Sequence, residues 1–257
     1  LCYGRYHPVY IPTGEDDAVK EYLRMRDDHK LALKKLKQQI NAFVLRHGHQ
    51  YTRTKWTIKH VAWLHKLELA PMYRETLDEY MASYEEQEAK IERYDKRIEE
   101  IAAEARYQEN AKKLSCFLGI RTHTAMSLIV ETGDFNRFSK GSTYAAFLGL
   151  APGEHSSSTS VNRLGISKAG NTHLRCLLIE AAKGICKGAI GRKSKELRSR
   201  QNCQSAEIIA YADKANIRLR SKYYKMIRRG KKKNVAVAAV ARELACFVWG
   251  MMTGNIA

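Results

Sequence analysis

The feature that most constrains the fold is a long stretch without glycine or proline, from Met72 to Arg106. Apolar residues within it recur at alternating spacings of three and four, which is typical of a helix that packs along one seam. They are Ile91, Tyr94, Ile98, Ile101 and Ala105. At a rise of about 1.5 Å per residue, this helix would span about 50 Å.

An earlier helix is predicted from Thr13 to about His47, with Gly48 as its stop. Thr13 has the character of an N-cap, and carboxylates in the first turn suit the positive helix end. We therefore interpret Glu15, Asp16 and Asp17 as a helix start and not as a metal site. The two helices could pair as an antiparallel hairpin or form the arm of a dimer, and the seam favours neither.

Trp56 and Trp63 are seven residues apart, a spacing that would place them on one helical face. We interpret them as packing anchors in preference to platforms for base stacking.

The charge of the chain is unevenly distributed. Of 257 residues, 45 are Lys or Arg and 27 are Asp or Glu, a formal net charge of +18. Residues 1–110 hold 19 basic and 19 acidic residues, so the whole surplus lies in residues 111–257. Solubility requires far less charge than this, and we therefore expect the second part to bind a polyanion.

The composition also bears on location. The apolar stretch from Val235 to Met252 contains Arg242 and Glu243, so it indicates a core helix and no membrane partner. The six cysteines contain no CxxC pair, which argues against a zinc site and a disulfide scaffold. With no leader-like segment at the start, we expect a cytoplasmic protein.

Residues 114–125 have the outline of a helix-hairpin-helix with Gly119 at the turn. Turn amides of such hairpins can face a phosphate. Here Arg121 stands at the position of the usual second glycine, so a structural turn and a phosphate contact are equally supported.

A loop rich in hydroxyl side chains is predicted over residues 153–165. Cations and a histidine follow it closely, at Arg163, Lys168, His173 and Arg175. A hydroxyl beside cations suits attack on a phosphodiester, because the cations hold the phosphate and stabilise its developing charge. A solvated linker would have the same composition.

The tail is strongly basic. Between Lys183 and Lys233 there are only three acidic residues, which are Glu196, Glu207 and Asp213. Because a solvated helix face would normally carry acids as well, this region favours contact with a nucleic-acid backbone.

The motifs now indicate a family. Residues 148–175 contain GLxP, a loop with adjacent serines, and then G-I-S-K-A-G-N-x-x-L-R. This segment resembles the C-terminal transposase domain of the insertion-sequence 110 family. The tryptophan segment, the seam helix, the hairpin and the helix from Asn234 to Trp249 resemble that family in the same order, over essentially the whole chain.

The resemblance implies a recombinase guided by a structured bridge RNA that pairs with donor and target DNA. Such proteins are similar in having an N-terminal RuvC-like domain whose four acids bind Mg²⁺. Residues 7–12 resemble the segment after that domain, so we expect those acids, and the magnesium, before Leu1 and none bound by this chain. The resemblance also implies a composite site, in which the acids of one subunit meet a serine of another.

The serine nucleophile maps to Ser157, with Ser156 and Ser158 as neighbouring alternatives. In the intact enzyme it would attack DNA and form a phosphoserine link, whereas this chain alone is expected to bind nucleic acid without cutting it. The residues expected to bind nucleic acid are Arg163, Lys168, Asn171, His173, Arg175, Arg228, Arg229, Lys231, Lys232 and Lys233.

We therefore predict a mainly α fold. Residues 1–12 would be a linker, residues 13–110 a coiled-coil helical arm, and residues 111–257 a basic, all-helical transposase domain. The expected partners are DNA, the bridge RNA and further copies of the chain, as a dimer or tetramer. The alternative is a non-catalytic RNA- or DNA-binding module with a helical oligomerisation arm, in which the serine loop is only a linker.

Overall fold

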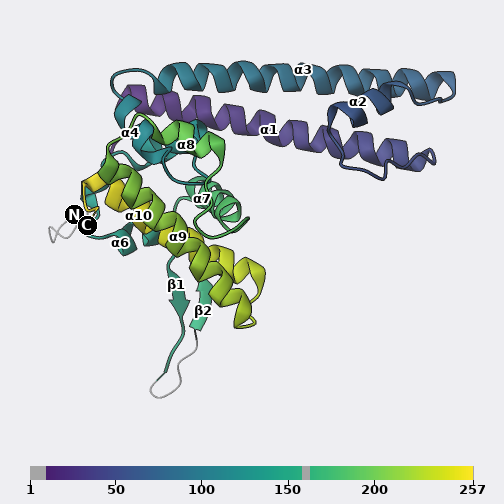
Figure 1. Cartoon of the computed structure of the whole chain (residues 1–257). Helices are drawn as coiled ribbons and strands as arrows, with labels where there is room; N and C mark the ends of the chain where they lie inside the picture. The colour runs from purple at the N-terminus through teal and green to yellow at the C-terminus, as the bar shows by residue number, and fades with distance from the viewer. Residues whose placement is uncertain (1–9, 158–162, 257) are drawn as a thin grey trace, which may run out of the picture. The chain divides into compact units, whose positions relative to one another are not determined.

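The fold is mainly α-helical, as predicted (Figure 1). The computed structural model describes residues 10–157 and 163–256. The first helices are α1 (Gly14–Arg46), α2 (Ile58–His65), α3 (Pro71–Ala102), α4 (Gln108–Leu114) and α5 (Thr122–Thr132). A 3-10 turn η1 (Phe135–Arg137), α6 (Gly141–Phe147) and strands β1 (Pro152–Glu154) and β2 (Arg163–Ile166) follow. The last helices are α7 (Thr172–Ile185), α8 (Lys195–Gln201), α9 (Ala206–Arg228) and α10 (Lys233–Thr253).

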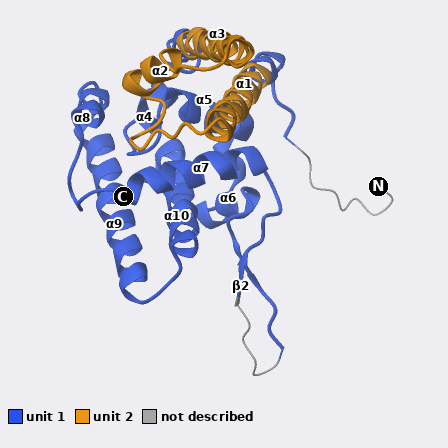
Figure 2. Ribbon diagram, turned by 90° about the vertical axis from the view of Figure 1, so that its right-hand side faces the viewer, with its two compact units in different colours: residues 1–20, 98–257 blue, residues 21–97 orange. Residues whose placement is uncertain are grey.

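The chain forms two compact units (Figure 2). One is a helical unit of residues 21–97, and the other is a basic unit of residues 1–20 and 98–257. The predicted boundaries were at residues 12 and 110. The difference arises because the start of α1 bonds to the segment that follows α3: Arg106 donates to Asp16 over 2.6 Å, and the Tyr107 hydroxyl donates to Asp16 over 2.7 Å.

The predicted helix start at Thr13 is confirmed. The backbone N–H of Asp16 donates to the Thr13 hydroxyl over 3.2 Å, as an N-cap requires. Burial raises the pKa of the Asp16 carboxyl, but hydrogen bonds from Tyr107 and Arg106 outweigh it and leave that pKa below its usual value. These acids serve the helix end, and among the described residues no three His, Cys, Asp or Glu side chains group to hold a metal.

In the helical unit, α1 and α3 pair antiparallel within one chain. Arg26 donates to Asp95 over 2.7 Å, and farther along the pair Lys37 donates to Glu88 over 2.9 Å. Between the helices lies a core of buried apolar side chains: Leu33, Ile40, Phe43, Val44, Leu77, Met81, Tyr84 and Ile91. Much of the apolar seam is thus covered inside the chain itself.

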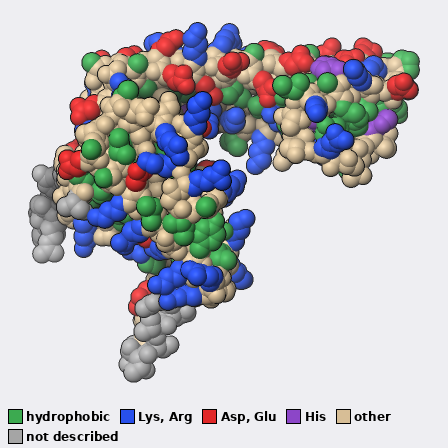
Figure 3. All heavy atoms as spheres, viewed as in Figure 1, with side chains coloured by type: hydrophobic (Ala, Val, Ile, Leu, Met, Phe, Trp, Pro, Cys, Tyr) green, Lys and Arg blue, Asp and Glu red, His purple; other side chains and the backbone are tan. Residues whose placement is uncertain are grey.

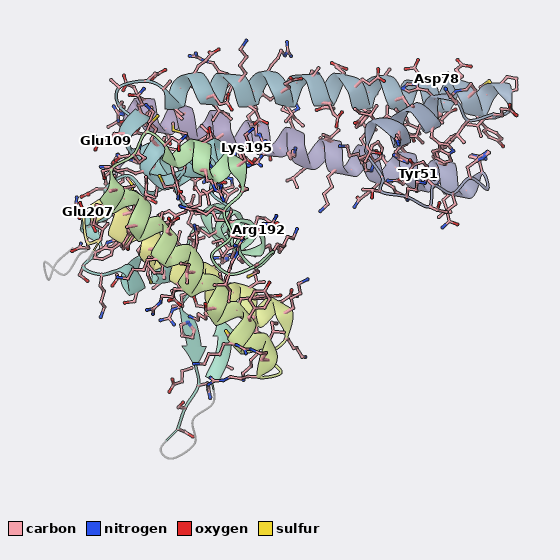
Figure 4. All side chains as sticks on the ribbon, viewed as in Figure 1. Tyr51, Asp78, Glu109, Arg192, Lys195 and Glu207 are labelled. Carbon is pink, nitrogen blue, oxygen red and sulfur yellow. The ribbon has the colours of Figure 1, made fainter. Side chains whose placement is uncertain are left out.

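The prediction that the two tryptophans share a helical face is wrong. The Thr57 hydroxyl accepts a bond from the His60 N–H, so α2 begins after Trp56, whose φ is +61°. Trp56 still packs against Tyr84, with ring centroids 5.0 Å apart. The ring centroid of Trp63 lies 5.1 Å from that of Tyr51, which is labelled in Figure 4. Both tryptophans are therefore packing anchors, as expected.

Helix α10 is a core element of the basic unit. Of the described helices, it is the one long and apolar enough to cross a membrane, but half of that apolar stretch is buried within the protein. It contacts α4, α6, α7 and α9 (Figure 2). This environment is the one expected of a core helix.

One buried arginine ties the segment between α7 and α8 to helix α9. Arg220 is 6% exposed, and its guanidinium donates to four backbone carbonyls over 2.6 to 2.8 Å. These acceptors are Ile185, Lys187, Ala189 and Arg192, the last of which is labelled in Figure 4. The charge of Arg220 is therefore used to hold a loop that has no regular backbone hydrogen bonding of its own.

Replacing Arg220 with methionine should strongly destabilise the protein. Arg220→Met keeps much of the side-chain volume but leaves four carbonyls without their donor, which we expect to lower the free energy of unfolding by about 3 kcal/mol or more. Arg218→Met is the matched control, because Arg218 is largely exposed on the same helix and pairs with Glu243. Its cost should stay below about 1 kcal/mol. Urea unfolding followed by circular dichroism measures both, and equal costs would contradict this role of Arg220.

Candidate nucleic-acid interface

The two halves of the sequence motif lie backbone against backbone at the base of a β-hairpin. The N–H of Ser167 donates to the carbonyl of Ala151 over 2.8 Å, and the N–H of Lys168 donates to that of Gly149 over 3.0 Å. The pairing continues as strands β1 and β2, which are antiparallel with Pro152 opposite Ile166. The sequence predicted an unpaired loop here, since its Ser and Gly content hides two strands of only three and four residues.

Glycine is required at two positions of this base. Gly149 and Gly170 have φ values of +68° and +119°, which other residues rarely adopt. A Cβ at Gly170 would collide with the carbonyl oxygen of Phe147, and one at Gly149 would meet Arg175 and the backbone of Ala169. The motif glycines therefore permit a close approach of two chain segments.

Ser157 is exposed and lies beyond the last residue of β1. The neighbouring Ser156 hydroxyl donates to Glu154 over 2.7 Å, and Ser158 lies outside the described residues. Figures 1 and 2 show the two strands leading away from the helices, and the exposure of Ser157 makes the predicted nucleophile accessible.

Arg175 points into the protein. It is 8% exposed, and its guanidinium donates to the carbonyl of Leu148 over 3.2 Å and to the hydroxyl of Thr172 over 2.9 Å. These bonds tie the start of α7 to the end of α6. In this structure Arg175 therefore supports the hairpin base from inside, and its role as a phosphate ligand stays a prediction.

Asn171 and His173 meet a carboxylate that the sequence analysis did not single out. The Glu131 side chain is 2% exposed; its carboxylate accepts from the Asn171 amide over 2.6 Å and lies 2.6 Å from His173 Nδ1. The Asn171 side-chain oxygen also caps α7 by accepting from the N–H of Leu174. The sequence does contain a sign of this contact, since Glu131 is the one acidic residue of the apolar helix α5. A carboxylate that is buried with such a helix needs a polar partner.

The motif residues whose side chains are described do not all face solvent with Ser157. Arg163 begins β2, and its side chain is outside the described part of the chain. Lys168 is exposed with a φ of +59°, and the described residues include no acidic partner for it. Of the motif residues, Ser157 and Lys168 face solvent, whereas Asn171, His173 and Arg175 bond within the protein.

A cluster of exposed positive charge lies at the turn between α9 and α10. All five of its predicted contact residues are exposed, and no acidic partner is found for any of them in residues 10–157 and 163–256. We call them the basic turn: Arg228, Arg229, Lys231, Lys232 and Lys233. Lys232 and Lys233 stand at the N-terminus of α10, where the helix dipole disfavours cations, so folding does not account for them. In Figure 3, Lys and Arg side chains gather on the viewed face over this end of α9 and α10.

Other cations of the tail are used internally. Lys193 is 2.5 Å from Asp213, and Lys222 is 2.6 Å from Glu243. Burial raises the pKa of the Glu243 carboxyl, but hydrogen bonds from Lys222 and Arg218 outweigh it and hold that pKa below its usual value. These pairs reduce the charge available to a ligand.

The helix-hairpin-helix outline is confirmed as α4, a turn and α5. Its turn is packed inside the protein: the N–H of Leu118 donates to the Asn216 side chain over 3.2 Å, and a Cβ at Gly119 would collide with the carbonyl of Ala181. The exposed Arg121 lies 3.0 Å from Glu196. Of the two interpretations, the structural turn is favoured.

Gly170→Ala should disrupt the hairpin base. The added Cβ has no room beside Phe147, and the positive φ is strained for alanine, so we expect a loss of about 3 kcal/mol or more in unfolding free energy. Gly165→Ala is the control, because a Cβ there meets nothing within 4 Å. Thermal unfolding of both variants tests this. A Gly170→Ala protein as stable as the control would show that the close approach is not needed.

The comparisons with known proteins agree with this geometry. Residues 109–197, which include the whole motif, match the family described as Transposase IS116/IS110/IS902 family. The putative transposase y4qE of Sinorhizobium fredii is 31% identical over 254 residues, which cover 96% of this chain and 60% of that protein. The transposase for insertion sequence element IS1533 of Leptospira borgpetersenii is 33% identical over 218 residues, which cover 83% of this chain and 62% of that protein.

The chain therefore spans about 60% of the length of these curated relatives. A shorter match, 35% identical over 98 residues, is with the transposase for insertion sequence element IS1111A of Coxiella burnetii. The resemblance drawn from the motif residues is confirmed: residues 109–197 match the IS116/IS110/IS902 transposase family, and the relatives that align with most of this chain are named as insertion-sequence transposases.

Proposed function

We propose that this chain is the DNA-binding and nucleophile-bearing part of a transposase that acts in the cytoplasm. The observation that carries the proposal is the basic turn, five exposed cations without acidic partners among the described residues, in a chain whose relatives are named transposases. Such a surface binds the phosphate backbone, because each neutralised phosphate releases counterions.

In the proposed reaction, the Ser157 oxygen attacks a DNA phosphorus, a phosphoserine bond forms and the P–O bond to one strand end breaks. The serine proton leaves with a base, and the released strand oxygen takes up a proton. A second strand's hydroxyl then attacks the phosphoserine, so the serine is regenerated and one phosphodiester replaces another. The exposure of Ser157 on a projecting hairpin supports this role, because a buried hydroxyl could not reach a strand.

The family resemblance implies Mg²⁺, but the described residues of this chain do not fit it, since no group of three His, Cys, Asp or Glu side chains lies together. A bridge RNA is the proposed guide. The proposed oligomer would form through apolar side chains that are exposed on the helical unit, such as Leu45, Ile58 and Met72.

Neutralising the basic turn should weaken DNA binding and its salt dependence. For Lys231→Gln/Lys232→Gln/Lys233→Gln, we expect the slope of log K against log salt to fall by about two to three, at about 0.9 per phosphate contact. Lys30→Gln/Lys34→Gln/Lys35→Gln on α1 removes the same charge from exposed positions and is the control. Fluorescence anisotropy with a labelled duplex measures both. Equal losses in the two variants would mean that the turn has no particular role.

Ser157→Ala in the full-length protein should abolish the covalent protein–DNA adduct while binding is retained, because only the attacking oxygen is removed. Ser156→Ala is the matched control, since that hydroxyl is already bonded to Glu154. Adducts are measured as DNA of reduced mobility in denaturing gels. Unchanged recombination by Ser157→Ala would favour the non-catalytic binding module. Loss of the adduct only in Ser156→Ala would assign the nucleophile to Ser156.

A further inference from the structure

A groove of about 860 Å³ lies within the basic unit, beside the hairpin. Strand β2 and helices α7, α9 and α10 contribute its walls, and its lining reaches Asn234 and Val235 at the start of α10, next to the basic turn. The volume is in the range of cavities that enclose small ligands, roughly 300–1,000 Å³. Of the described lining residues, Lys168 is the one already expected to contact nucleic acid.

The groove combines apolar walls with cations. Leu164 and Val235 line it and remain 54% and 52% exposed, which is unusual for large apolar side chains without a role. The basic lining residues are Lys168, Lys183, Lys222 and Arg242, and no acidic residue is among the described lining. A ligand for this surface needs both negative charge and an apolar face.

The cations differ in how far they are neutralised. Lys183 pairs with Glu180 at 2.5 Å, and Lys222 pairs with Glu243 at 2.6 Å. Lys168 and Arg242 are exposed, and the described part of the chain supplies neither with an acidic partner. Lys168 comes from the hairpin base and Arg242 from α10, so unneutralised charge is supplied by two elements that contribute to the lining.

A DNA duplex fits this surface poorly, because the broad apolar faces of its bases are stacked inside and cannot lie against Leu164 and Val235. A protein segment would have to be both acidic and apolar, and the described chain offers no sign of one. An unpaired nucleotide has the required combination, since its phosphate is anionic and its base has an exposed apolar face.

We propose that the groove binds unpaired nucleotides of a single strand, with the bases against Leu164 and Val235 and the phosphates near Lys168 and Arg242. The inference rests on the proposed nucleic-acid function and deepens it, because it assigns duplex backbone to the basic turn and single-stranded segments to the groove. The adjacency of the two surfaces would place both at the junction between paired and unpaired strands.

The test compares three probes of equal length on the 257-residue chain: a single-stranded DNA, the same strand with abasic sites throughout, and a duplex. The variant is Leu164→Ser/Val235→Ser. Its control is Ile190→Ser/Ile217→Ser, which changes two apolar side chains of similar exposure, 50% and 46%, outside the groove. Dissociation constants come from fluorescence anisotropy, and melting curves check that the variants fold. If the serine pair lowers the melting temperature, Leu164→Ala/Val235→Ala replaces it.

We expect the wild-type chain to bind the normal single strand about tenfold more tightly than the abasic strand, a difference of about 1.4 kcal/mol. The groove variant should lose that preference, while its affinity for duplex stays unchanged and the control variant behaves as wild type. Equal binding of normal and abasic strands, or equal losses for single strand and duplex, would overturn the groove assignment and leave the nucleic-acid function intact. If no probe binds the wild-type chain, the proposed function itself fails.

Discussion

The rest of the candidate site depends on a close approach between two backbone segments of the basic unit. The chain that follows α6 lies so near the chain that leads into α7 that neither Gly149 nor Gly170 has room for a Cβ. The N–H of Asn171 also bonds to the carbonyl of Phe147 over 3.0 Å. Because the base of the hairpin is held by backbone contacts, the direction of its two strands is fixed. A reactive group on such an element is held in place by a rigid support.

The net charge of this chain overstates the charge available to a ligand. Arg175 and Arg220 are buried, and their guanidinium groups donate to backbone carbonyls of the protein. Arginine suits this use, since its planar fork presents several donors in fixed geometry. Lys193 and Lys222 are paired with carboxylates. The basic turn, Lys168 and Arg242 are among the exposed cations that keep their charge available to a ligand.

A division of labour follows within the family motif. Ser157 and Lys168 lie at the surface, whereas Asn171, His173 and Arg175 hold the hairpin base and the start of α7 against the buried Glu131 carboxylate and the Leu148 carbonyl. Under the proposed function, the inward-facing residues position the outward-facing ones. The groove and the basic turn border the same end of α10, so both proposed binding surfaces lie at one end of the basic unit. Ser157 lies apart from them, on the hairpin.

The sequence by itself determined the features that depend on local spacing. These include the two long helices, the N-cap at Thr13, the core helix α10, the exposed basic turn and the family. It failed at Trp56, because the Thr57 hydroxyl caps α2, which begins at Ile58 and therefore excludes Trp56. Only the tertiary structure decided that residues 152–154 and 163–166 pair, and that Arg175 faces the Leu148 carbonyl. Glu131 and His173 are 42 residues apart, and no local pattern encodes which distant partner a buried charge will meet, because that choice is made by the packing of helices against one another.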